Sequence, residues 1–244
     1  MITVRAIDGL PEVEPGAALG AMLAGEATSE DVLVVSQKVV SKAEGRVRDL
    51  GSVEPGGEAV ELAATLGKDP RVLQLILDES RRIVRAERGV LIVETRSGLV
   101  CANAGIDSSN VPGNERVALL PEDPDSSARR LRAEIRSVSG NGPGVVIADS
   151  FGRPWRLGQT DVAIGCAGLT PLDDWRDRRD RDGRKLEATA AAIADEAAAA
   201  ASLVRDKASG APAAVIAGLA RFVTTADGPG AAALRRAEAD DLFG

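Results

Sequence analysis

Two aspartates stand where carboxylates could bind a divalent cation. Asp107 lies in the polar segment 103–113, and Asp149 directly follows the apolar run 145–148, with Ser150 beside it. Two carboxylates and a hydroxyl are hard oxygen donors, which suit Mg²⁺ or Mn²⁺ and leave coordination positions for phosphate oxygens. The plainer alternative is that both aspartates form turns, because Asp side chains accept hydrogen bonds from nearby backbone amides.

The candidate cations lie in separate parts of the chain. Lys42 is one of only 5 lysines against 25 arginines; its compact ammonium could neutralise a phosphate, or it could be an exposed surface lysine. Arg153 and Arg156 flank Trp155 between glycine and proline residues. Their guanidinium groups could hold an anionic substrate, or the segment could be a surface loop with the tryptophan as packing anchor. Asp161 could support the site or cap a strand.

Composition excludes several classes of protein. The chain has 244 residues, 44% of them hydrophobic and 27% charged, with a net charge of −7 at pH 7. This balance excludes wholesale disorder and argues against broad nucleic-acid binding, which needs a basic surface. The absence of histidine excludes Ser-His-Asp and Cys-His triads and histidine-ligated zinc.

The expected location is the cytoplasm. No apolar run approaches the roughly 20 residues of a membrane-spanning helix, and the N-terminal residues lack the pattern of a signal peptide. Two cysteines, Cys101 and Cys166, are too few for a disulfide framework. Neither GxxxxGK[ST] nor GxGxxG occurs, so a nucleotide site would need another architecture.

The elements that must position these residues are mixed strands and helices. Apolar and alternating runs predict strands at 2–7, 31–36, 82–86, 90–94, 99–102, 145–148, 162–169 and 213–216. Helical spacing and capping signals predict helices at 17–25, 56–66, 70–78, 125–137 and, rich in alanine, 186–204. Because strands and helices do not alternate regularly, the pattern predicts an α+β fold.

The chain is expected to form one unit over residues 1–244. The Ser/Gly/Pro-rich stretch 138–144 suggests a junction between two closely associated subdomains. The strand at 145–148 is expected to end at Asp149, and the densely charged stretch 176–184 to form a solvated loop or the start of a helix. Residues 227–244 form a polar tail that we expect to fray.

Six segments in order give the chain a resemblance to a known family. They are SQKVVSKAEGR, ESRRIVR, GLVCANAGIDSSN, LPEDPD, DSFGRPWR and GQTDVAIG, which begin at residues 36, 79, 98, 120, 149 and 158. In this order the chain closely resembles the coenzyme F420-0:L-glutamate ligase family, also called F420:γ-glutamyl ligase, in its stand-alone form. The resemblance extends from about residue 8 to 220, nearly the whole chain.

The resemblance implies a GDP-forming acid–amino-acid ligase. Such an enzyme uses GTP and Mn²⁺ or Mg²⁺, with K⁺ as an optional further cation, to add L-glutamate to the deazaflavin precursor F420-0; γ-linked glutamates can follow. We expect the precursor's carboxylate to take the γ-phosphate of GTP, forming an acyl phosphate that the amine of glutamate attacks. The resemblance further implies an unusual α+β fold and an intertwined homodimer, with F420-0, L-glutamate and GTP as partners.

Site residues follow from the matching positions. Asp107 and Asp149 match the family's metal-binding aspartates, and Ser150 matches the next metal ligand, which is often threonine in relatives. With Lys42 the two aspartates form the expected catalytic set. The expected GTP contacts are Leu10, Pro11, Glu12, Val13, Gln37, Lys42, Asn110, Lys207 and Gly210, and the expected substrate contacts are Arg153, Arg156 and Asp161.

Some positions depart from the family's pattern. Asp206 replaces an expected glycine beside Lys207, Ser97 stands where relatives often have histidine, and the segment 175–177 differs. Two other functions stay open: a metal-dependent phosphohydrolase, or a ligase for another carboxylate substrate. A third alternative is a non-catalytic module, in which the acidic loops are only turns.

Overall fold

The computed structural model describes residues 1–109, 111–113, 115–205 and 210–240. Helices and strands occur together in mixed sheets, which confirms the α+β prediction. The largest sheet has five strands in the order β1-β12-β2-β8-β9, in which β2 and β8 are parallel and the other neighbours antiparallel. In that order, the strands span Thr3–Ile7, Ala213–Ala217, Val32–Ser36, Gly144–Arg153 and Arg156–Ala167.

Alternating side chains place apolar residues on both faces of this sheet. In β2, Leu33 and Val35 face one core while Val32 and Val34 face the other. The helices α1 (Leu19–Leu23), α2 (Gln37–Ala43) and α5 (Pro124–Ser139) pack against the first face. The alanine-rich α6 (Ile193–Ser202) covers the second, where its buried alanines let the helix backbone approach the sheet closely.

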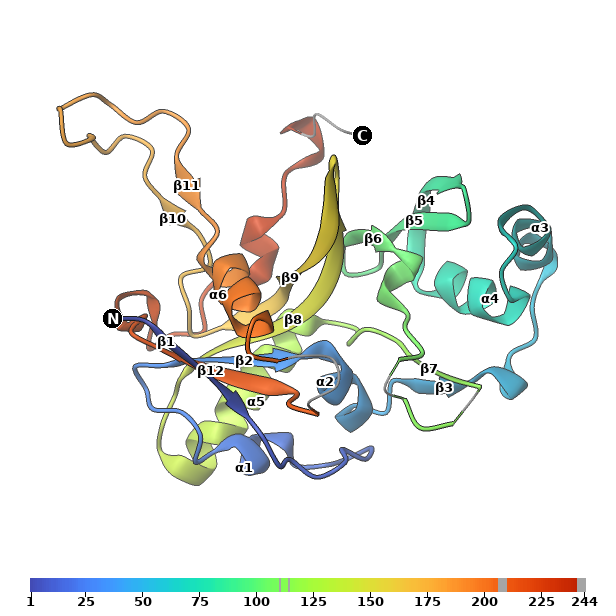
Figure 1. Cartoon of the computed structure of the whole chain (residues 1–244), viewed down its shortest axis with the longest axis horizontal. Coiled ribbons are helices and arrows are strands. Elements are labelled where there is room, and N and C mark those ends of the chain that lie inside the picture. Colours follow the sequence, from blue (N-terminus) through green and yellow to red (C-terminus); the bar gives the residue numbers. More distant parts are fainter. Residues whose placement is uncertain (110, 114, 206–209, 241–244) are drawn as a thin grey trace.

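A second lobe is built from the chain between α2 and α5 (Figure 1). It contains a three-stranded sheet in the order β4-β5-β6, a two-stranded sheet of β3 and β7, and two helices with a separate apolar core. The strands β3 to β7 span Val47–Asp49, Ser80–Glu87, Val90–Thr95, Val100–Ala102 and Arg116–Ala118, and helices α3 and α4 span Gly57–Leu66 and Pro70–Asp78.

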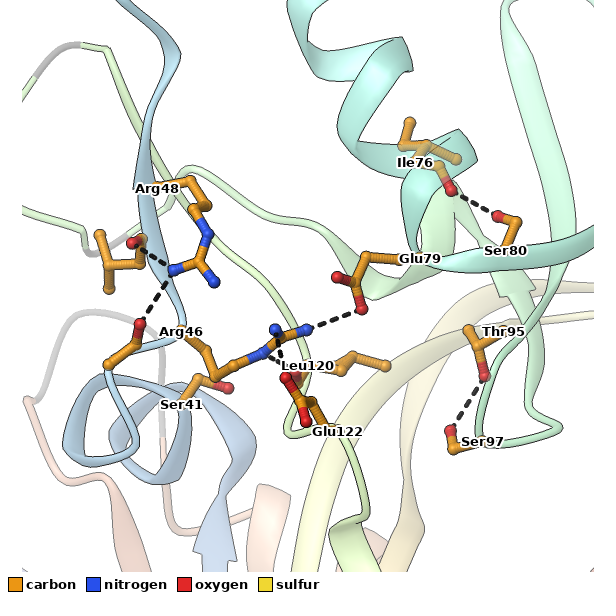
Figure 2. Close-up of polar contacts among 12 residues, drawn as sticks. Ser41, Arg46, Arg48, Ile76, Glu79, Ser80, Thr95, Ser97, Leu120 and Glu122 are labelled. Carbon is orange, nitrogen blue, oxygen red and sulfur yellow. Dashed lines mark hydrogen bonds and ion pairs between the residues drawn. The ribbon is translucent and has the colours of Figure 1, made fainter. Parts of the chain in front are cut away.

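The buried Arg46 joins the two lobes where the chain crosses between them. Figure 2 shows its guanidinium between Leu120, Glu122 and Glu79. Nε donates to the Leu120 carbonyl at 3.0 Å, Nη1 to Glu122 at 3.1 Å and Nη2 to Glu79 at 2.7 Å. Arg46 lies on the segment that leads from the body into the second lobe, and Leu120 lies on the segment that leads back. Glu79 lies at the end of α4. One side chain therefore fastens both crossings to the second lobe.

Several predicted boundaries are wrong. The strand at 145–148 does not end at Asp149: β8 continues to Arg153, because residues 149–153 pair with the start of β9 in a long hairpin. The predicted helix over 186–204 begins only at Ile193. Residues 190–191 instead form β11, paired with β10 (Asp173–Asp174) in an arm that extends from the body (Figure 1).

The sequence patterns predicted neither α2 nor the short strands β3, β7 and β10. The helix α2 (Gln37–Ala43) follows β2 without a break, and Ser36 caps it by accepting a hydrogen bond from the Lys38 amide. The short strand β7 lies in a segment that was assigned no structure. Stretch 138–144 connects α5 to β8, and the expected division into subdomains there stays a prediction.

Part of the C-terminal tail is bound to the start of α5. Contrary to the expected fraying, the amides of Ala231 and Ala232 donate to Asp125, and Ala231 is buried. Cys101 and Cys166 are both buried and both free thiols. Among the helices that the structure describes, none has both the length and the apolar character to cross a bilayer.

Candidate active site

A large cleft lies between the two lobes at the carboxyl ends of β2 and β8. Its volume is about 2040 Å³, and residues of both lobes line it. The last parallel pair is Ser36 with Ala148; α2 begins directly after the first and Asp149 directly follows the second. Ligands in sheets with parallel strands bind at such carboxyl ends. The cleft exceeds the 300–1,000 Å³ of an ordinary small-molecule site, so it has room for more than one substrate.

Two lysines of α2 reach into the cleft. Lys38 and Lys42 are four residues apart and therefore lie on the same side of the helix. Nζ of Lys42 lies 2.5 Å from Oε1 of Glu12, in the loop after β1. Nζ of Lys38 lies 2.7 Å from Oδ2 of Asp107 and also contacts Ser109 Oγ. Lys38 is not among the predicted site residues, because its spacing of four residues from Lys42 is a signal only once a helix is known there.

Asp107 is held in place by its own loop and by β7. Its backbone pairs with Ala118, and its carboxylate accepts hydrogen bonds from the amide and hydroxyl of Ser109 at 2.8 and 2.7 Å. The preceding Gly105 has φ +69°, and a Cβ there would come within 2.6 Å of Leu120, so the turn requires glycine. Burial acts to raise the pKa of Asp107, but the hydrogen bonds from Lys38 and Ser109 outweigh it and lower that pKa.

Asp149 and Ser150 are neighbours on β8, and Ser150 lies opposite Asp161 of β9. The Ser150 hydroxyl donates to Oδ1 of Asp161 at 2.7 Å. Burial, with the negative charges of Asp161 and Asp107, raises the pKa of Asp149 to about 6, against the opposing effects of the Ser150 amide and Lys38. The carboxylates therefore repel one another in a poorly solvated place, where a bound cation would be stabilising.

Arg205, just beyond α6, is a second cleft residue that the sequence analysis missed. Its Nη2 donates to Oδ2 of Asp161 at 2.7 Å and its Nη1 to the Pro212 carbonyl at 3.1 Å. Only 6% of its side chain is exposed, and burial lowers the pKa of its guanidinium against the raising effect of Asp161. Nothing in the local sequence distinguishes this arginine from the other 24.

The cleft brings together most of the predicted site residues. Those lining it are Leu10, Pro11, Glu12, Val13, Lys42, Asp107, Asp149, Ser150, Arg153, Asp161 and Gly210. Arg156 is exposed at the start of β9 and does not line the cleft. Gln37 is buried behind it, where Oε1 accepts a hydrogen bond from Ser41. Asn110 and Lys207 lie outside the described residues.

The oxygen donors fit a hard cation that is shared with a ligand. Within the described ranges, no three Asp, Glu, His or Cys side chains come close enough to form a complete metal site. Asp107, Asp149 and the Ser150 hydroxyl line the same cleft, which is the usual protein contribution to a Mg²⁺ site that phosphate oxygens complete. The donor set therefore suits a metal that enters with a phosphorylated substrate.

Comparisons with known proteins agree over nearly the whole chain. Residues 9–218 match the model of the family described as F420-0:Gamma-glutamyl ligase. The coenzyme F420:L-glutamate ligase of Haloarcula marismortui is 47% identical over 222 residues, which cover 87% of this chain and 86% of the relative. The proteins of that name from Methanopyrus kandleri and Methanothermobacter thermautotrophicus are 45% and 40% identical, and the alignments cover 95% and 100% of this chain and 93% and 99% of the relatives.

Proposed function

Because the chain belongs to the F420-0:γ-glutamyl ligase family, we propose that it joins L-glutamate to coenzyme F420-0 through an amide bond, using GTP and a divalent metal, in coenzyme F420 biosynthesis. The observation that carries this proposal is the cleft, which Asp107, Asp149 and Ser150 line together with Lys38 and Lys42. Such a ligase needs one place where a nucleotide, an acceptor carboxylate and an amine meet, and the volume of this cleft suits that requirement.

The reaction would proceed in two balanced steps. In the first, the terminal carboxylate of F420-0 bonds to the γ-phosphorus of GTP, the bond to the bridging oxygen breaks, and GDP leaves with that electron pair. In the second, the amine of L-glutamate bonds to the acyl carbon, phosphate leaves, and the nitrogen gives up a proton to solvent. Both steps are accelerated by positioning and by neutralising negative charge, so no covalent nucleophile of the protein is required.

Asp107, Asp149 and Ser150 would hold Mg²⁺ or Mn²⁺. The metal, when bound, neutralises charge on the phosphate oxygens during transfer. Lys38 and Lys42 of α2 would bring further positive charge to the phosphates, with Glu12 orienting Lys42 through their 2.5 Å contact. The loop 10–13 would lie on the nucleotide, since all four of its residues line the cleft.

We propose further that two copies of the chain associate. The tip of the β8–β9 hairpin projects from the body (Figure 1), and Leu157 near that tip is 98% exposed. An exposed large apolar side chain on a projecting hairpin suits a surface that a second copy covers. A Leu157→Asp variant should shift the mass measured by light scattering toward the monomer. The enzyme would work in the cytoplasm, where GTP is available.

A product assay tests the reaction. Purified protein is incubated with F420-0, L-glutamate, GTP and Mn²⁺, and products are analysed by mass spectrometry. Addition of glutamate that requires both GTP and metal supports the proposal and gives the number of glutamates added. GTP hydrolysis without an acceptor favours a phosphohydrolase instead. Nucleotide binding without product formation points to another carboxylate acceptor.

A further inference from the structure

Three side chains in the cleft form a connected series that ends at Arg205. The Ser150 hydroxyl donates to one oxygen of Asp161, and the other oxygen of Asp161 accepts from Nη2 of Arg205, each at 2.7 Å. The side chains of Asp161 and Arg205 are 14% and 6% exposed. Both oxygens of the carboxylate are thus engaged, one by the arginine and one by the serine.

The direction of these hydrogen bonds decides what Ser150 can do. A guanidinium can only donate, and an ionised carboxylate can only accept. Because Arg205 holds the Asp161 carboxylate in place, the proton of the Ser150 hydroxyl is committed to Asp161. The lone pairs of Ser150 Oγ are then left for a cation. Without the arginine, the Asp161 carboxylate would lose one of its two partners and could turn away from Ser150.

Arg205 also connects this series to another wall of the cleft. Its Nη1 donates to the carbonyl of Pro212, at 3.1 Å, where the chain enters β12. Gly210 and Pro212 line the cleft together with Ser150. The same guanidinium therefore fixes the β8–β9 hairpin relative to the segment that leads into β12.

We infer that Arg205 is a positioning residue: through Asp161 it orients the Ser150 hydroxyl so that the oxygen, not the proton, faces the metal and phosphates. This inference rests on the proposed function, in which Ser150 is a metal ligand. Arg205 needs no contact with substrate or metal in this role. Groups that orient a metal ligand in this way are worth about 10–100-fold in metal affinity.

The test is a double-mutant cycle on metal binding. Mn²⁺ is titrated by electron paramagnetic resonance into the full chain with a GTP analogue that is not hydrolysed. Arg205→Met, Ser150→Ala and the double variant are compared with the unaltered chain. In the unaltered chain, Arg205→Met should weaken Mn²⁺ binding at least about tenfold. In the Ser150→Ala chain, the same change should weaken it further by at most about twofold, because Arg205 acts through the Ser150 hydroxyl.

Matched variants separate positioning from simple damage to the fold. Arg205→Lys should restore part of the affinity, since it keeps a donor to Asp161. Asp161→Asn has the same shape, but its amide nitrogen would donate to Ser150 while its oxygen accepts from Arg205. It should therefore weaken Mn²⁺ binding as much as Arg205→Met does. Arg5→Met removes an exposed ion pair between Arg5 of β1 and Glu26, and it should leave the Mn²⁺ affinity unchanged.

Three outcomes would overturn the inference in distinguishable ways. Unchanged Mn²⁺ affinity in Arg205→Met, or an equal loss in the presence and absence of the Ser150 hydroxyl, would show that Arg205 does not act through Ser150 while leaving the proposed function standing. An unaltered chain that binds no Mn²⁺ would overturn the proposed metal dependence and this inference with it. Urea unfolding of each variant, measured alongside, shows whether a loss of affinity follows from a loss of fold.

Discussion

Asp125, at the start of α5, should be among the residues whose loss costs the fold most. Its Oδ1 accepts from the amides of Cys166 and Ala231, at 2.8 and 2.6 Å, and its Oδ2 accepts from the amide of Ala232 at 3.1 Å. The residue is buried. One carboxylate thus connects α5, the end of β9 and the C-terminal segment, and it satisfies three backbone donors.

The size of the effect follows from which donors each variant leaves unsatisfied. Asp125→Ala removes all three acceptors, and each buried donor left unpaired costs about 1–3 kcal/mol. We expect the free energy of unfolding to fall by about 3–6 kcal/mol, allowing for water that reaches Ala232. Asp125→Asn keeps Oδ1 with its two donors and loses only the bond from Ala232, so it should cost about 1–3 kcal/mol.

Equilibrium unfolding in urea, followed by circular dichroism, measures both values. The control is Asp123→Ala, because Asp123 caps the same helix through the Ser126 amide at 3.0 Å but at an exposed position. Asp123→Ala should lower the free energy of unfolding by about 1 kcal/mol. Equal losses for Asp125→Ala and Asp125→Asn, or a loss for Asp125→Ala no greater than for Asp123→Ala, would refute the reasoning from unsatisfied donors.

Three further predictions concern the cleft and the thiols. Asp149→Asn should lower glutamate addition at least about 100-fold, because it removes a negative ligand for the metal, with a urea midpoint no lower than that of the unaltered chain, because it also removes a charge that burial disfavours; near-normal turnover would contradict the metal assignment. Lys42→Ala should raise the KM for GTP about tenfold, the value of one charge-assisted contact. Glu12→Gln should raise it far less, and equal effects of the two changes would argue against a phosphate contact by Lys42. Burial raises the pKa of the Cys101 and Cys166 thiols to about 12, assisted by nearby carboxylates. At pH 8 iodoacetamide should therefore modify them about a thousandfold more slowly in the native chain than in urea, as mass spectrometry would show; fast native labelling would contradict the burial.

Local signals in the sequence were sufficient for most of the fold. The apolar run within 31–36 identified β2, and the polar residues 125–127 signalled the start of α5, although the helix begins at Pro124 and its cap is Asp123. These local signals failed where a segment's structure depends on the strand with which it pairs. Asp149 and Ser150 looked like the end of a strand because they are polar, but β9 supplies their partners. Residues 190–192 have the alanine content of a helix, yet β10 holds residues 190–191 extended.

The candidate site was predictable only in part. Asp149 directly follows an apolar run and Asp107 lies in a polar segment, and both line one cleft with Lys42. Lys38 and Arg205 were missed because their roles depend on partners far away in the sequence: Asp107 is 69 residues from Lys38, and Asp161 is 44 residues from Arg205. A sequence shows which residues are charged, but only the fold shows which charges face one another.

The contacts of Arg46 have a consequence for how the cleft can open. Both chain crossings between the lobes meet at this one guanidinium, and Glu79 of the second lobe binds it as well (Figure 2). Two bodies whose connecting segments meet in one small region can rotate about that region more easily than they can slide. The second lobe, which carries Asp107, should therefore approach Asp149 and Ser150 by a hinge rotation centred on Arg46, and the fit of the two walls around bound substrates is set by an arginine that does not line the cleft.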